Sequence, residues 1–122
     1  MQSVGVELHK TSLFLTDYRE IILEIADANP DAAERLCDAV ESALKLLSQH
    51  PQIARKAGFA HAPKVRRWVL QSFPNYSIYY KDHPGEIVLI RLLHGARDAP
   101  PLIHRHKNRV GFSLQKFSGK SG

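Results

Sequence analysis

The sequence of 122 residues contains a single cysteine, Cys37. An intramolecular disulfide bond is therefore excluded. This usage is typical of a reducing compartment. No apolar run approaches the ~20 residues of a membrane-spanning helix. The N-terminal residues also lack the basic stretch and apolar core of a signal peptide. We therefore expect a cytoplasmic protein without membrane contact. An apolar fraction of 43% is ordinary for one globular domain of this length.

The patterns that usually bind cofactors or metals are missing as well. There is no glycine-rich phosphate loop, no nucleophile elbow and no Cys-x-x-Cys pair. His104 and His106 form a pair of imidazoles, but no cysteine or carboxylate stands near them at a spacing typical of zinc sites. We therefore expect no metal and no cofactor, and we interpret Cys37 as a buried structural thiol.

Acidic residues are scarce in the second part of the chain. Residues 1–50 carry four Lys/Arg against nine Asp/Glu, whereas residues 51–122 carry thirteen Lys/Arg against three Asp/Glu. Such a division predicts a basic face that meets an anionic partner, either nucleic acid or an acidic protein segment. The alternative is a basic surface that simply faces solvent.

The longest apolar stretch lies between Glu86 and His94 and is rich in β-branched residues. This composition predicts a central strand that is buried on both faces. Arg91 interrupts the stretch, so its charge is expected either to be paired within the chain or to contact a partner. The strand ends in a polar segment, His94 to Asp98, in which Gly95 allows a sharp turn.

The remaining patterns predict an α+β fold in which an antiparallel sheet packs against a helical hairpin. A period of two over Ser3–His9 indicates a strand, and helical spacing follows Thr11 or Ser12, either of which can cap the helix. Asn29-Pro30 begins a second helix. A connection over residues 52–64 leads to three strands joined by short turns, at residues 65–71, 76–81 and 86–94. We expect one domain over residues 1–103 and a basic, flexible extension over residues 104–122.

Several basic and aromatic residues of the predicted sheet are candidates for function. They are Arg66 and Arg67 on its first meander strand, Tyr79 and Tyr80 on the second, and His94 and Arg97 after the third. If they converge, they form a basic patch for a phosphate backbone and stacked bases. For RNA cleavage, Arg97 would stabilise the charged phosphorane and His94 would transfer a proton. Alternatively, Tyr80 and Trp68 are core aromatics, and His94 makes only a local hydrogen bond.

The order of elements resembles the RelE/ParE family of toxins from bacterial type II toxin–antitoxin systems. The matching segments are NPDAAERL at residues 29–36, LLSQHP at 46–51, VRRWVL at 65–70, YSIYYK at 76–81 and IRLLHGARD at 90–98. The resemblance implies a compact α+β toxin that a small antitoxin neutralises. It also implies that a flexible, acidic antitoxin segment crosses the basic side of the sheet.

Two activities occur in this family, and the resemblance is closer to ParE, whose members inhibit DNA gyrase. RelE-like members instead cleave mRNA on the ribosome. Ser77 stands where the cleaving type has an arginine, and no tyrosine follows Tyr80. The resemblance thus implies a growth-arresting gyrase inhibitor without catalytic residues. Its expected contacts to target or antitoxin are Arg66, Arg67, Tyr79, Arg91 and Arg97.

Two alternatives remain open from the sequence. The first is a ribosome-dependent mRNA endoribonuclease with Arg66, Arg67, His94 and Arg97 in its site, which would then contact ribosome and mRNA. The second is a binding module derived from a toxin that has lost its toxicity.

Overall fold

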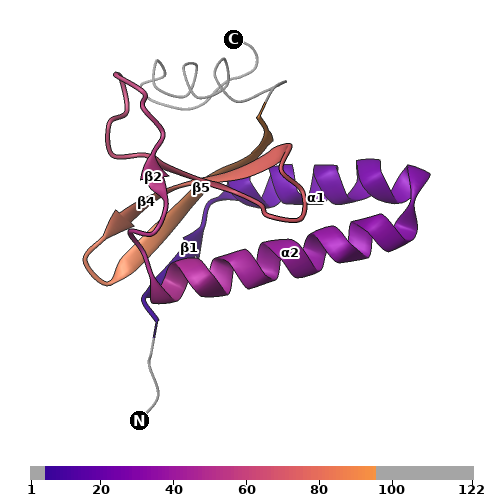
Figure 1. Cartoon of the computed structure of the whole chain (residues 1–122), viewed down its shortest axis with the longest axis horizontal. Coiled ribbons are helices and arrows are strands. Elements are labelled where there is room, and N and C mark those ends of the chain that lie inside the picture. Colours follow the sequence, from indigo (N-terminus) through magenta and orange to yellow (C-terminus); the bar gives the residue numbers. More distant parts are fainter. Residues whose placement is uncertain (1–4, 96–122) are drawn as a thin grey trace.

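The computed structural model describes residues 5–95 as two helices and a five-stranded sheet (Figure 1). The order of strands across the sheet is β1-β5-β4-β3-β2. The elements follow the chain as β1 (Glu7–Lys10), α1 (Ser12–Ala28), α2 (Pro30–Gln49), β2 (Arg55–Lys56), β3 (Arg66–Val69), β4 (Tyr76–His83) and β5 (Glu86–His94). The α+β class and the helical hairpin predicted from the sequence are confirmed. Neither described helix combines the length and apolarity needed to cross a bilayer.

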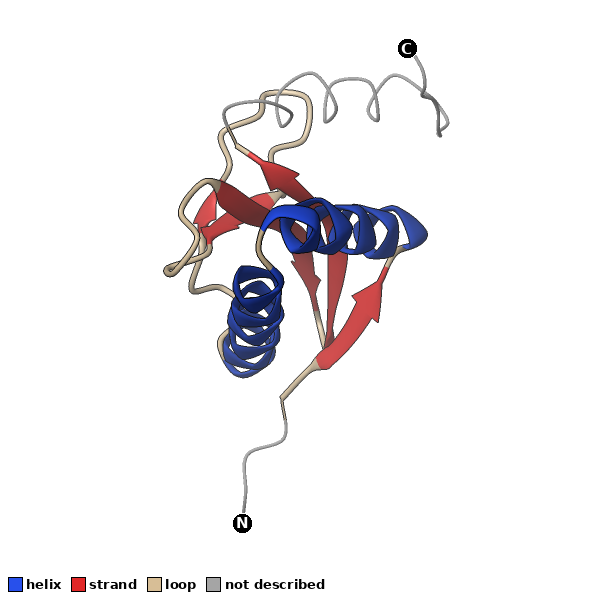
Figure 2. Ribbon diagram, turned by 90° about the vertical axis from the view of Figure 1, so that its right-hand side faces the viewer, coloured by secondary structure: helices blue, strands red, loops and turns tan. Residues whose placement is uncertain are grey.

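Side-chain caps define the two helices as the sequence predicts. Thr11 Oγ1 accepts a hydrogen bond from the Phe14 N–H at 3.1 Å and donates one to the Leu89 carbonyl at 2.8 Å. Asn29 ends α1, where its N–H donates to the Ile25 carbonyl at 2.8 Å. Its side-chain oxygen then accepts from the Ala32 N–H at 3.1 Å at the start of α2. One residue thus serves both helix ends, which makes the connection very short and folds the helices back on each other (Figures 1 and 2).

The sheet is mixed rather than wholly antiparallel. The meander β3-β4-β5 is antiparallel as expected, but β1 pairs with β5 in parallel, with Leu8 opposite Ile87. A short strand, β2, also forms inside the segment that the sequence indicated as a connection. Neither feature has a local signal, because the direction of an edge strand depends on where the packed hairpin returns the chain.

The core occupies the face of the sheet that the helices cover. Phe14, Leu36 and Leu47 of the hairpin are fully buried against the sheet, together with Ile78, Tyr80, Ile87, Leu89 and Leu92. A smaller cluster on the opposite face joins Val65, Tyr79 and Leu93 to Phe59 and its neighbours in the segment before β3. The prediction that β5 lies inside the sheet is confirmed, but its burial on both faces is confirmed only in part, because Val88 and Ile90 on the open face are only partly buried. Cys37 is only partly buried.

Charge separates along the fold. Between Ser12 and Gln49 the hairpin carries three Lys/Arg against eight Asp/Glu, whereas residues 50–95 carry seven against two. The hairpin is consequently acidic, and residues 50–95, which include strands β2 to β5, are basic. This part of the molecule thus has the sign of charge that attracts anions.

Candidate binding surface

The adjacent arginines of β3 point to opposite faces of the sheet, because successive side chains of a strand alternate. Arg66 lies opposite Tyr80 on the helix-covered face. Its Nε donates to Asp82 Oδ1 at 2.9 Å and its Nη1 to the Ala54 carbonyl at 2.7 Å. Arg67 lies on the open face, is exposed, and donates from Nε to Ser77 Oγ at 3.1 Å. Of the two, Arg67 is the one accessible to a partner.

Arg66 and Gln52 favour the ionised form of Asp82. Burial raises the pKa of the Asp82 carboxyl, but the hydrogen bonds from Arg66 and Gln52, with the Arg66 charge, together hold it below its usual 3.8. Both partners are mostly buried, with side-chain exposures of 15% for Arg66 and 18% for Asp82. Such a pair stabilises the fold while the carboxylate is charged.

Asp82→Asn is therefore expected to lower the free energy of unfolding by about 1–3 kcal/mol at pH 7. Because the folded-state pKa lies below the unfolded value of 3.8, the stabilisation is complete above that value and is lost as the pH falls through the folded pKa. Urea unfolding at pH 7 and at pH 3 should show the difference from wild type shrinking in acid. Glu34→Gln, at an exposed position of α2, is the matched control and should change little at either pH. A deficit that is constant with pH would contradict the assignment.

Arg91, the charge within the apolar strand, is paired inside the chain. Its Nε and Nη2 donate to the two carboxylate oxygens of Asp17 on α1 at 2.7 and 2.8 Å. The Leu92 N–H donates to the same carboxylate at 3.1 Å, so Asp17 also caps the edge of β5 beyond its pairing with β1. Burial raises the pKa of Asp17, an effect that the Arg91 hydrogen bonds and charge oppose. Arg91 is 8% exposed, so its guanidinium contributes mainly to the stability of the fold and offers little surface for contact with a partner.

Of the three tyrosines of β4, Tyr79 and Tyr80 lie on opposite faces of the sheet, and both are buried. Tyr80 is inaccessible and donates from its hydroxyl to the Pro51 carbonyl at 2.8 Å. Tyr79 is 2% exposed, and its ring stacks on Phe59 with centroids 6.1 Å apart. Burial raises the pKa of Tyr79, and the nearby Arg67 charge opposes this effect. The interpretation of Tyr80 as a core aromatic is confirmed, whereas Trp68 is partly buried and packs against the core. Tyr79 holds the segment before β3 against the sheet.

His94 lies at the far end of β4 from Arg66. It is opposite Tyr76, and the two rings meet edge to face with centroids 5.3 Å apart. Its Nδ1 is buried and makes no hydrogen bond within the described part of the chain. The local hydrogen bond that the sequence suggested for His94 is thus not seen at that nitrogen.

The candidates for RNA cleavage do not form one cluster among residues 5–95. Arg66 pairs across from Tyr80 and His94 from Tyr76, four residues apart on β4, or roughly 13 Å at about 3.3 Å per residue. Arg67 lies on the other face, although its Nη2 would lie 3.3 Å from a Cβ added at Gly95. Arg97, the pair His104 and His106, and the extension from residue 104 lie outside the described residues. No group of three metal-binding side chains occurs between residues 5 and 95.

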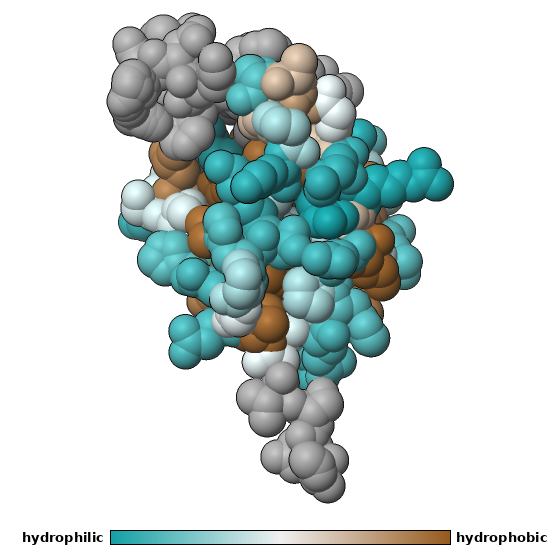
Figure 3. All heavy atoms as spheres, turned by 90° about the vertical axis from the view of Figure 1, so that its left-hand side faces the viewer, coloured by the Kyte–Doolittle hydropathy of each residue, from teal (hydrophilic) through white to brown (hydrophobic). Residues whose placement is uncertain are grey.

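The open face carries a cationic surface that sequence reasoning found only in part. Arg55 stands opposite Arg67 across the β2–β3 pair. On the same face of the sheet lies a pocket of about 550 Å³ whose lining contains Lys64 and Lys81 but neither arginine, and no Asp or Glu. Its apolar lining comes from Leu13 at the start of α1, Ala62, Pro63, Val65, Val88 and Ile90. We call the surface formed by Arg55, Lys64, Arg67 and Lys81 the basic open face. Figure 3, viewed from the left of Figure 1, shows a largely hydrophilic surface with separate hydrophobic patches.

Neither Lys64 nor Lys81 was among the contact residues predicted from the sequence. Lys81 follows Tyr79 at the strand period of two, a signal that could have placed it on this face. Lys64 belongs to a segment without any period, whose position is fixed by the packing of Phe59 and Val65 around Tyr79.

Comparisons with known proteins agree with this architecture. The sequence model of a family described as "ParE toxin of type II toxin-antitoxin system, parDE" matches residues 8–99. Among solved structures, a chain from "Chromosomal ParDE TA system from P. aeruginosa" has a similar fold, with a TM-score of 0.63 and 22% sequence identity. The similarity covers 75% of this chain and 98% of that chain. No curated protein matches the sequence.

Proposed function

Since the chain belongs to the ParE toxin family of type II toxin–antitoxin systems, we propose that this toxin inhibits DNA gyrase by binding and that a cognate antitoxin neutralises it. The observation that carries the proposal beyond the family is the dispersal of the candidate catalytic residues that lie within residues 5–95. Arg66 is engaged by Asp82, and Arg67 and His94 lie on opposite faces of the sheet. An inhibitor that acts through contact needs no such cluster.

The basic open face is the surface we propose for the antitoxin. Lys64 and Lys81 line an apolar pocket whose lining has no acidic residue, and Arg55 and Arg67 pair across β2 and β3 on the same face. An acidic segment with a bulky apolar side chain complements both properties, because the side chain fills the pocket while carboxylates meet the rim. Arg97 follows β5 directly in sequence, and we propose it as a further contact to target or antitoxin.

Purified toxin tests the proposed target directly. We expect it to inhibit gyrase supercoiling and to raise the level of gyrase–DNA cleavage complexes, and we expect the cognate antitoxin to abolish both effects. A parallel assay measures cleavage of mRNA on translating ribosomes. Unchanged gyrase activity together with ribosome-dependent cleavage would overturn the proposal in favour of the endoribonuclease. A protein that leaves both unchanged and does not arrest growth on induction would be the non-toxic binding module.

A charge reversal tests the proposed surface. Arg67→Glu is expected to weaken antitoxin binding about tenfold or more, since it places a carboxylate among those of the partner. Arg19→Glu, at an exposed position of α1, is the control for the change in net charge. Isothermal titration calorimetry at low and at moderate salt should show that only the first substitution matters. Equal effects of the two variants would remove the basic open face from the proposal.

A further inference from the structure

The apolar pocket on the open face, which we call the open-face pocket, lies where β5 departs from regular pairing. On β4, Tyr79 stands opposite Arg91 and Tyr80 opposite Leu89. Ile90, which lies between those two residues of β5, therefore has no partner on β4. A bulge of this kind often occurs beside a functional site, because it redirects a side chain. Ile90 packs beside the Tyr79 cluster but is only partly buried, so it leaves apolar surface accessible in the pocket.

Three separate parts of the chain form the open-face pocket of about 550 Å³. Val88 and Ile90 contribute from β5, Leu13 from the start of α1, and residues 61–65 from the segment before β3. Thr11 also belongs to the lining, but its hydroxyl already makes hydrogen bonds within the chain. A volume of this size with a mainly apolar lining is typical of pockets that bind small molecules.

The charged groups of this lining are all basic. Lys81 stands directly opposite Val88 across the β4–β5 pair, and Lys64 belongs to the segment before β3. Neither lysine forms an ion pair with another residue between positions 5 and 95. His61 and His83 add two imidazoles to the lining. The two ammonium groups are thus available to an anion, and the alkyl stems that carry them add apolar surface to the pocket.

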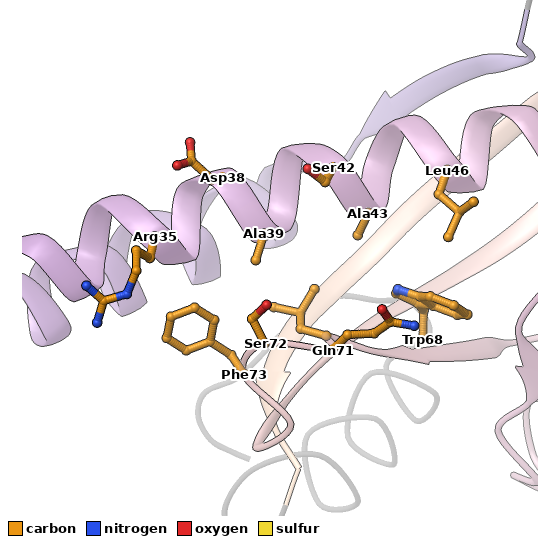
Figure 4. Close-up of a pocket in the computed structure, with 11 residues that line it drawn as sticks. Arg35, Asp38, Ala39, Ser42, Ala43, Leu46, Trp68, Gln71, Ser72 and Phe73 are labelled. Atoms are coloured by element: carbon orange, nitrogen blue, oxygen red, sulfur yellow. The ribbon is translucent and has the colours of Figure 1, made fainter.

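A hollow of similar size between α2 and the end of β3 lacks this combination. Its volume is about 540 Å³, and its lining includes both Arg35 and Asp38, so both signs of charge are present. Figure 4 shows these side chains around the hollow together with the polar Ser42, Gln71 and Ser72. Size alone therefore does not distinguish the two cavities. The open-face pocket is the one whose lining selects a ligand by the sign of its charge.

We propose that the open-face pocket binds a small amphipathic anion, a molecule whose alkyl or aryl body carries one carboxylate or phosphate head group. The apolar body would contact Val88 and Ile90, and the head group would meet the ammonium groups of Lys64 and Lys81. Burial of the apolar body supplies most of the affinity. The two lysines favour an anionic head group over a neutral or a cationic one.

Such a ligand and the antitoxin would share one site. The proposed antitoxin contact places a bulky apolar side chain in this pocket and carboxylates at its lysines, which is the same chemistry within a larger molecule. A small anion bound here would therefore compete with the antitoxin and release the toxin. This consequence, unlike the binding itself, rests on the proposed neutralisation by an antitoxin.

Two other occupants fit the lining less well. Residues 104–122 contain five Lys/Arg and no Asp or Glu, so Lys64 and Lys81 repel them. A second copy of the chain in a symmetric dimer would bring the basic open face against its own equivalent. A dimer in solution that Val88→Trp dissociates would show that a second copy fills the pocket, and it would refute the assignment to a small anion.

A series of ligands with one chain length tests the chemistry on the full-length toxin. We expect octanoate or octyl phosphate to bind and to shift the amide resonances of Val88 and Ile90 in an NMR titration. Octanol and octylammonium, which carry a neutral and a cationic head group on the same body, should bind at least about tenfold more weakly. Butyrate, with half the chain, should bind about a hundredfold more weakly than octanoate. Binding of neither anion, or equal binding of all the head groups, would overturn the proposal.

Substitutions locate the bound anion. Lys64→Met and Lys81→Met remove the charge but keep an apolar side chain, and each should weaken binding of the anion about tenfold. Lys45→Met, at an exposed position of α2, is the matched control and should leave the affinity unchanged. Val88→Trp fills the pocket and should abolish binding, and circular dichroism verifies that each variant folds. Unchanged affinity in both Lys64→Met and Lys81→Met would place the anion elsewhere and refute the site.

Competition separates the ligand site from the proposed function. Octanoate at about ten times its Kd should weaken the apparent affinity of the antitoxin about tenfold, as measured by calorimetry. Octanoate that shifts Val88 and Ile90 while the antitoxin affinity stays unchanged would overturn the shared site. An antitoxin that does not bind the free toxin would overturn the proposed function and leave the anion site intact.

Discussion

Arg91→Met is expected to lower the free energy of unfolding by about 3–5 kcal/mol, since it removes one partner of a buried ion pair. Asp17 would keep its burial and the Leu92 N–H but lose both hydrogen bonds from the guanidinium. The Asp17 carboxylate would then be charged and uncompensated in an apolar setting. Urea denaturation followed by circular dichroism measures the loss.

The pH dependence of this variant has a defined sign. Burial already raises the pKa of Asp17 in the folded protein, and losing Arg91 raises it further. For an acid whose folded pKa lies above its unfolded value, the penalty is present above the folded pKa and disappears as the pH falls below the unfolded value of 3.8. The deficit of Arg91→Met should therefore be largest at neutral pH and shrink in acid, as that of Asp82→Asn does, although the folded-state pKa values of Asp17 and Asp82 are shifted in opposite directions.

The double variant Asp17→Leu/Arg91→Met is the matched control. It removes both charges, so it should be more stable than Arg91→Met alone, although the Leu92 N–H loses its acceptor. A double variant less stable than Arg91→Met would contradict an account based on an uncompensated carboxylate. Unchanged stability of Arg91→Met would show that the pair contributes nothing to the fold.

Tyr79→Ala is expected to cost about 3 kcal/mol, because it empties the centre of the smaller core cluster. The ring packs with Val65 and Leu93 and stacks on Phe59, so its loss releases the segment before β3 from the sheet. Chemical denaturation measures the global loss. Hydrogen exchange should show the greatest increase over residues 57–65.

Tyr79→Phe separates this structural role from the contact role expected from the sequence. It keeps the ring and removes only the hydroxyl, so stability should stay within about 0.5 kcal/mol of wild type. If antitoxin or gyrase binding nevertheless weakens, the hydroxyl is a contact in its own right. If Tyr79→Ala proves as stable as wild type, the ring does not hold the segment.

The elements that could be predicted from the sequence are those whose signals are local. Thr11 and Asn29 mark helix starts because a side-chain oxygen satisfies exposed amides wherever it stands. The apolar run over β5 predicted a strand inside the sheet, although its open face is only partly buried at Val88 and Ile90. The parallel pairing of β1 could not be predicted, because Leu8 meets Ile87 only after the hairpin has packed.

Local sequence signals also failed to predict which residues of the candidate site lie together. Neighbouring positions such as Arg66 and Arg67 appeared as one basic motif, yet strand alternation separates them by the thickness of the sheet. Arg91 was correctly identified as a charge that needs an explanation, and pairing was one of two options. Its partner Asp17 had no signal, because a carboxylate within an amphipathic helix normally faces solvent.

The parallel pairing of β1 with β5 has a consequence for how the toxin is synthesised. Thr11 bonds Leu89, and Asp17 bonds Arg91, across 78 and 74 positions of the chain. The N-terminal strand and the start of α1 therefore cannot take their final places until the last strand has left the ribosome. A nascent chain that stalls or is truncated before β5 lacks both partners, so it cannot complete this fold.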